Sequence, residues 1–182
     1  MTDHAEIAVR RWLAEFVVGL NLCPYARPLM GAANLRIVIC GVSDETVLRR
    51  AFLRELDLLQ CSIERDIATT LLAFSEALQD FQEYLRFLAG AQELLVESGL
   101  EGVVQLASFH PHYRFAGETP GAASHYSNRS PYPIIHLLRE DMLTRAVQEA
   151  GDPYRIPDRN IQTLTGIGAE ELERRWQALF LP

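Results

Sequence analysis

Two histidines flank a single proline in the stretch SFHPHYRFAG, residues 108–117. A neutral histidine exchanges protons near pH 7, which makes His110 a candidate general acid or base. In an extended segment, His110 and His112 would point the same way, as the ligands of a metal ion must. The structural alternative is a crowded turn at the end of a strand, in which neither ring does chemistry.

Cys23 is the best candidate nucleophile among the three cysteines. It follows an apolar helical stretch and precedes Pro24, so we expect it in a loop, where a histidine or arginine could stabilise its thiolate. The preceding helix C-terminus opposes a thiolate, and the structural alternative is a small buried side chain that fills a gap at the helix end. Cys40, in a strand, and Cys61, at a helix end, have the character of structural residues.

The stretch SNRSPYP, residues 127–133, brings an amide, a guanidinium and a hydroxyl together before a stiff proline turn. Such a turn can aim the donors of Asn128, Arg129 and Ser130 at a carboxylate or phosphate. Alternatively, Asn128 and Ser130 satisfy the backbone of their own turn. The structural alternative is favoured for Ser130 and the binding role for Arg129.

Composition excludes several classes of protein. The formal net charge is −7, which disfavours nucleic acid and anionic membrane surfaces as partners. All 17 fixed positive charges are arginines, so a Walker A nucleotide site and a Schiff-base lysine for pyridoxal phosphate are both excluded. No cofactor is specified by the remaining residues. No apolar run is long enough to span a bilayer, and three distant cysteines predict reduced thiols in a cytoplasmic protein.

Apolar periodicity predicts alternating helices and strands along the whole chain. Strands are expected over 34–41, 68–74, 103–109 and 134–139, and helices over 9–20, 43–60, 75–99, 140–150, 160–164 and 169–179. Ser43 and Ser75 are the expected caps of the second and third helices. The order predicts one α/β domain over residues 1–182, with a sheet of about four strands, largely parallel or mixed, and flanking helices.

The irregular segment 110–133 is the expected site, because ligands gather beyond the carboxyl ends of strands in open α/β sheets. Glu118 is the one acidic residue between Glu101 and Glu140, a region that also holds Arg114, Arg129 and Arg139. A cationic segment in an acidic protein fits a small anionic molecule. Ion pairs with carboxylates elsewhere in the protein are the alternative.

Four stretches, GLNLCPYA (19–26), QLASFHPHYRFAG (105–117), NRSPYPIIHLLRE (128–140) and DRNIQTL (158–164), carry a family resemblance. In these motifs the chain resembles the bacterial and plant domain-of-unknown-function family fourteen-fifteen. The resemblance implies a stand-alone cytoplasmic domain. Its motif residues include Cys23, His110, Tyr113, Asn128, Arg129, Ser130, Tyr132, His136 and Arg139. His112 stands where the family pattern carries an acidic residue, which weakens a metal site built on His112.

Three hypotheses for function follow. The first is an enzyme acting on a small anionic metabolite, with His110 and Cys23 catalytic and with Arg129, Asn128, Ser130, Tyr113, Tyr132 and Arg139 binding the substrate. The second is a metal-binding protein that uses His110, His136 and Cys23. The third is a non-catalytic interaction module, in which the aromatic-rich segment packs on a partner protein.

Overall fold

A computed structural model describes residues 2–150 and 155–181. Its centre is a four-stranded sheet of β1 (Leu35–Cys40), β2 (Thr69–Phe74), β3 (Val104–Phe109) and β4 (Ile134–Arg139), in the order β1-β2-β4-β3. β1 and β2 are parallel, and β4 is antiparallel to both β2 and β3. The predicted α/β fold with a mixed sheet is confirmed. The long segment 110–133 allows β4 to return antiparallel between β2 and β3.

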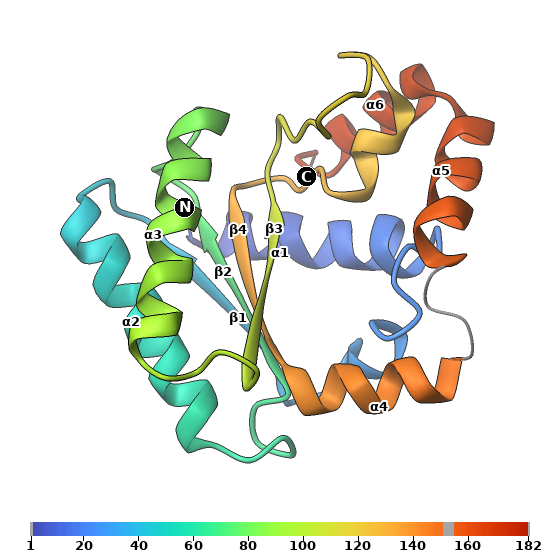
Figure 1. The fold of residues 1–182 in the computed structure, drawn as a ribbon. Coiled ribbons are helices and arrows are strands. Elements are labelled where there is room, and N and C mark those ends of the chain that lie inside the picture. The colour runs from blue at the N-terminus through green and yellow to red at the C-terminus, as the bar shows by residue number, and fades with distance from the viewer. Residues whose placement is uncertain (1, 151–154, 182) are drawn as a thin grey trace.

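Helices cover both faces of the sheet (Figure 1). α2 (Glu45–Cys61) and α3 (Phe81–Glu97) pack on one face, whereas α1 (Thr2–Trp12) lies on the other. Side chains alternate along β2, so Leu72 and Phe74 join the core under α2 and α3, while Leu71 and Ala73 join the core under α1. Because both faces are covered, β2 is an uninterrupted buried stretch.

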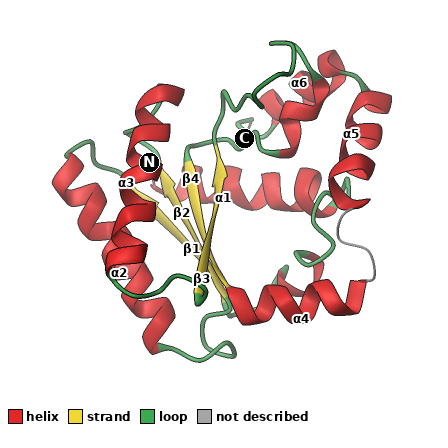
Figure 2. Cartoon of the chain, in the orientation of Figure 1, coloured by secondary structure: helices red, strands yellow, loops and turns green. Residues whose placement is uncertain are grey.

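The C-terminal helices extend the layer on the α1 side. They are α4 (Glu140–Ala150), α5 (Arg155–Ile167) and α6 (Ala169–Ala178), shown in red with the other helices in Figure 2. α5 and α6 pack against η3 (Ala123–Ser127), a short 3₁₀ helix inside the irregular segment. Leu164 and Leu172 from these two helices complete the second core. The irregular segment is therefore held between the sheet and the helices α5 and α6.

Several predicted helix boundaries are wrong. Asp44, not Ser43, caps α2, because its carboxylate accepts the backbone N–H of Val47 at 3.0 Å. α3 begins at Phe81 under the same kind of cap from Asp80, well after Ser75. Aspartate is at least as good a cap as serine, so the better-placed residue is used in each case. α5 is also longer than expected, and its Pro157 lies in the first turn, where a missing N–H costs nothing.

The first predicted helix is present, but it begins at Thr2 and not at Val9, and its geometry changes partway. α1 continues directly into η1 (Leu13–Val18), a π-helical segment with wider turns. Leu13, Phe16 and Val17 of this segment are buried. The chain then leaves the helix through Asn21, which has a left-handed backbone with φ of 54°. Such π segments are frequent at functional sites, and this one leads directly to Cys23.

Within residues 2–150 and 155–181, no helix has both the length and the apolar character needed to cross a membrane.

Candidate functional site

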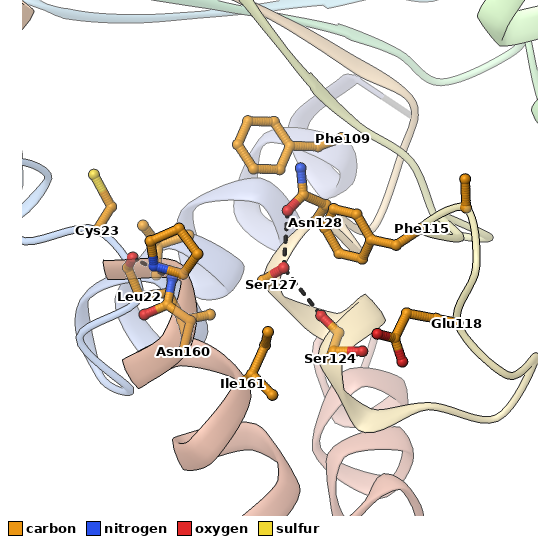
Figure 3. A pocket seen from close by; sticks show the side chains of 13 residues that line it. Leu22, Cys23, Phe109, Phe115, Glu118, Ser124, Ser127, Asn128, Asn160 and Ile161 are labelled. Carbon is orange, nitrogen blue, oxygen red and sulfur yellow. Dashed lines mark hydrogen bonds between the residues drawn. The ribbon is translucent and has the colours of Figure 1, made fainter. Parts of the chain in front are cut away.

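A cavity of about 530 Å³ lies at the edge of the sheet where β3 ends (Figure 3). We call it the outer cavity. Its polar side chains are Cys23, Glu118, Ser124, Ser127, Asn128 and Asn160, and Phe109, Phe115 and Ile161 are among its apolar ones. Cys23 lies on one side of the view and Glu118 on the other. A volume of this size, lined by apolar groups and a few converging polar ones, is typical of sites for small molecules.

One wall of the outer cavity is a hydrogen-bonded polar cluster. The Asn128 amide donates to the carbonyl of Ser108 at 3.0 Å, and this bond joins η3 to β3. The Ser127 hydroxyl lies within hydrogen-bond distance of two acceptors, Asn128 Oδ1 at 2.9 Å and the Ser124 carbonyl at 3.0 Å. The Ser124 hydroxyl is buried without a hydrogen-bond partner among the described residues. This wall therefore presents fixed donors and acceptors.

His125 holds the loop that forms the facing wall. Its Nδ1 accepts the backbone N–H of Phe115 at 3.2 Å, and its Nε2 donates to the carbonyl of Thr119 at 2.9 Å. The ring is fully buried. Because both nitrogens are used, His125 is a structural residue that positions Phe115 and Glu118 beside the cavity.

The loop that carries Cys23 is held by α5. Asn160 donates from its amide to the carbonyl of Leu22 at 2.8 Å, and Arg159 donates to the carbonyl of Asn21 at 2.6 Å. Burial raises the pKa of the half-buried Cys23 thiol, although backbone N–H groups and the charge of Arg159 act to lower that pKa. The thiol is therefore protonated at neutral pH, and Arg159 is the cation whose field favours the thiolate.

A second cavity, of about 170 Å³, adjoins the outer cavity on the α1 face of the sheet. We call it the inner cavity. Its lining comes from the strands, from the first helical segment, from the loop around Tyr25 and from α4. The lining residues include Leu71, Ala107, His136, Trp12, Leu13, Met142 and Leu143. Val17, Cys23 and Phe109 line both cavities. Cys23 thus lies at the boundary between a polar cavity and an apolar one.

His136 is the histidine that shares a cavity with Cys23. Its Nε2 lies 2.6 Å from the hydroxyl of Thr69, which itself donates to the carbonyl of Leu137 at 2.7 Å. The Thr69 hydroxyl must then accept from His136, so the proton of the neutral ring is on Nε2 and Nδ1 is left as an acceptor. Burial lowers the pKa of His136 to about 4. The ring is therefore neutral over the physiological range.

A family model covers nearly all of this structure. The model is described as a protein of unknown function (DUF1415), and it matches residues 4–174. The chain belongs to the DUF1415 family. No curated protein and no solved structure matches it significantly.

The four sequence stretches that carry the resemblance to DUF1415 converge on the two cavities. Cys23 comes from the first stretch, Phe109 and Phe115 from the second, Asn128 from the third, and Asn160 from the last. Hydrogen bonds between the first and the last of these stretches join residues that are 138 positions apart along the chain. Neither composition nor periodicity shows that the stretches meet, because composition carries no positions and periodicity relates only residues that are close in the sequence.

His110 lies away from this site in the DUF1415 fold. It is fully buried on the other face of the sheet, with the rings of Phe81 and Tyr84 each 5.1 Å from its own. Its Nε2 donates to the carbonyl of Leu78 at 3.0 Å, and its Nδ1 accepts the backbone N–H of His112 at 3.0 Å. Burial lowers the pKa of His110. The structure does not bring it together with Cys23.

Arg129 and Ser130 are engaged by the protein itself. The Arg129 guanidinium lies 4.6 Å from the centre of the Tyr126 ring and 3.5 Å from the carbonyl of Tyr113. Ser130 is buried, and its hydroxyl donates to the carbonyl of Tyr132 at 2.5 Å. It therefore satisfies the backbone of its own turn, which was the favoured alternative for this residue. Neither residue lines the outer or the inner cavity.

The remaining predicted binding residues also make internal contacts. Arg139 donates to the carbonyls of Leu59, Ser62 and Ile67 at 2.6, 2.7 and 3.0 Å. Tyr113 packs against the rings of Phe81 and Phe115, and Tyr132 packs edge-on against Phe180. Of the substrate-binding set predicted from the sequence, Asn128 alone lines the outer cavity.

The metal-ligand set is not assembled either. In the described part of the chain, no group of three or more histidine, cysteine and acidic side chains is arranged to hold a metal ion. Cys23 and His136 both line the inner cavity, but His110 lies on the opposite face of the sheet.

Sequence reasoning missed several residues of the site. Ser124, Ser127 and Glu118 line the outer cavity but carry no local signal, since serines and acidic residues in loops are common. Arg159 and Asn160 had a usable signal, because both lie in DRNIQTL, a stretch already singled out by the family resemblance.

Proposed function

We propose that this protein is an enzyme that acts on a small metabolite bound in the outer cavity, with Cys23 in contact with the reacting part. The position of Cys23 at the boundary of two cavities carries the proposal. Support also comes from the fixed polar groups of Ser127, Asn128 and Asn160, which can orient a ligand beside the thiol.

Arg159 takes the electrostatic role in this proposal. Like Arg129 and Arg139, it donates to a backbone carbonyl and lines neither cavity, but its charge acts on Cys23 and on Tyr25, lowering the pKa of each against the larger effect of burial. An arginine beside a thiol favours both an anionic ligand group and loss of the thiol proton. His136, not His110, is the histidine proposed to assist, because its Nδ1 is an acceptor and it shares the inner cavity with Cys23.

A cytoplasmic location is part of the same proposal. The three cysteines are all free thiols, and proteins of the reducing cytoplasm keep their cysteines in this state.

The test uses the full chain and a panel of small carboxylates and phosphates, screened by ligand-observed NMR and then for turnover. A ligand of the site should bind about 10-fold more weakly to Arg159→Gln, and its turnover should be lost in Cys23→Ser. Cys61→Ser is the matched control, because Cys61 is exposed at the end of α2 and lines neither cavity. Ligands that bind Arg159→Gln like the wild type, or turnover that survives Cys23→Ser, would contradict the proposal.

A further inference from the structure

The inner cavity differs from the outer one in the kind of group it can accept. Its walls are apolar side chains from η1, β2, β3, β4 and α4, such as Leu13, Leu71, Leu138 and Leu143. The polar residues at its surface are Cys23, Tyr25, Thr69, Trp12 and His136. The Thr69 hydroxyl is already occupied by its bonds to His136 and Leu137, and therefore offers little to a ligand.

The inner cavity carries no charge near neutral pH. Burial lowers the pKa of His136 to about 4 and raises the pKa values of Cys23 and Tyr25, so all three groups are neutral there. Arg, Asp and Glu are absent from the described residues that line it. A charged ligand group would lose its hydration in this cavity without gaining an ion pair, which is costly.

The volume sets the size of the accepted group. The cavity measures about 170 Å³, and an apolar cavity of roughly 150 Å³ is large enough to bind benzene. A water-filled cavity needs several polar partners for each water molecule. Trp12 Nε1 and the Tyr25 hydroxyl lack partners among the described residues, but both atoms are buried and expose almost no surface to a water molecule. An apolar group the size of one six-membered ring therefore matches both the volume and the lining.

The shared wall links this group to the proposed substrate. Val17, Cys23 and Phe109 border both cavities, so a ligand whose polar part lies in the outer cavity meets the inner one at the thiol. We infer that the substrate is an amphipathic molecule, with an uncharged apolar group of about benzene size in the inner cavity and a polar, hydrogen-bonding part in the outer cavity. The inference rests on the proposed function for the statement that this ligand is a substrate.

The experiment measures the inner cavity directly, without an activity assay. Fluorobenzene is titrated into the full chain and followed by ¹⁹F NMR. In the Trp176→Phe background, Trp12 is the one remaining tryptophan and reports from the cavity wall by its fluorescence. We expect saturable binding at a single site that changes the Trp12 emission.

Two variants change the volume of the inner cavity in opposite directions. Ala107→Leu adds carbon atoms into the cavity and should weaken fluorobenzene binding at least 10-fold. Leu143→Ala trims the half-buried α4 wall and should shift the preference toward a larger ring, tested with 5-fluoroindole. Ala89→Leu is the matched control, since Ala89 is exposed on α3, on the far side of the sheet.

The outcomes separate this inference from the proposed function. Absence of saturable binding, or binding that Ala107→Leu leaves unchanged, overturns the inference even if Cys23 proves essential for turnover of some metabolite. If fluorobenzene binding follows the volume of the cavity, the apolar specificity stands. A failed metabolite screen would then count against the enzyme proposal alone.

Discussion

The side-chain amide of Asn160 donates a hydrogen bond to the backbone carbonyl of Leu22 at 2.8 Å, across 138 residues of chain. The neighbouring Arg159 makes a parallel contact to the carbonyl of Asn21. These two bonds join α5 to the loop that presents Cys23. The position of the thiol therefore depends on a helix near the end of the chain.

Loss of the Asn160 contact should loosen the Cys23 loop. In Asn160→Ala the half-buried carbonyl of Leu22 loses its partner, which should lower the free energy of unfolding by about 1–3 kcal/mol. Alkylation of Cys23 by iodoacetamide should also become faster, measured in a Cys40→Ser, Cys61→Ser background. Asn34→Ala is the control, because Asn34 makes the same kind of bond to Glu64 in an exposed position. Unchanged alkylation in Asn160→Ala would show that the bond does not position the thiol.

The charge of Arg159 should be visible in the titration of Cys23. Burial raises the pKa of this thiol, while Arg159 acts to lower it, so removal of the positive charge must raise the pKa further. In the same single-thiol background, the alkylation rate plotted against pH should have a midpoint above that of an exposed cysteine. Arg159→Gln should move that midpoint upward, and Arg10→Gln, in an exposed ion pair with Glu6, should not. A midpoint that stays in place would remove Arg159 from the site.

The sheet and most helices were predictable because their signals are local. Alternation along β2 and the apolar stripe of α2 follow from neighbouring residues, and a helix between two strands favours a parallel pair such as β1 and β2. The same reasoning applied to the helix between β2 and β3 favours these strands as neighbours, which is wrong, because β4 lies between them. The position of β4 depends on how the segment 110–133 folds back, which no periodicity describes.

The site itself was predictable only in part. Cys23 and Asn128 were chosen from residue type and local turn chemistry, and both line the outer cavity. His110 was chosen in the same way, but it follows Phe109 directly on an alternating strand, and the two side chains therefore point to opposite faces. Phe109 reaches the cavities and His110 does not. The outer cavity also needs α5, whose Asn160 and Ile161 line it, and the packing of α5 is a tertiary contact.

Arg139 should matter for stability, in contrast with the binding role predicted from the sequence. Its guanidinium donates to three carbonyls at the end of α2 and in the following loop, a fork that one lysine ammonium cannot reproduce. Arg139→Lys should lower the free energy of unfolding by about 1–3 kcal/mol in urea titrations. Arg54→Lys, with a side chain that is 73% exposed, should change little. A stable Arg139→Lys protein with weakened ligand binding would restore the binding role.

The partly buried His136 should make the protein less stable in mild acid. Its pKa is about 4 in the folded state and near 6.5 when exposed, so the unfolded state binds more protons between these values. Stability is therefore fully present above pH 6.5 and falls as the pH drops toward 4, by up to about 3 kcal/mol. His110, whose pKa is also lowered, adds to this loss.

The His136→Gln variant isolates the contribution of His136. It should be less stable than the wild type at pH 7.5, because the bond to Thr69 is disturbed, but its free energy of unfolding should fall less steeply between pH 6.5 and 4. His4→Gln, at an exposed position in α1, should keep the wild-type slope. Urea titrations at four pH values measure the slopes. Equal slopes for the wild type and His136→Gln would mean that His136 takes up a proton as easily in the folded chain as in the unfolded one, and the inner cavity would then hold a charge.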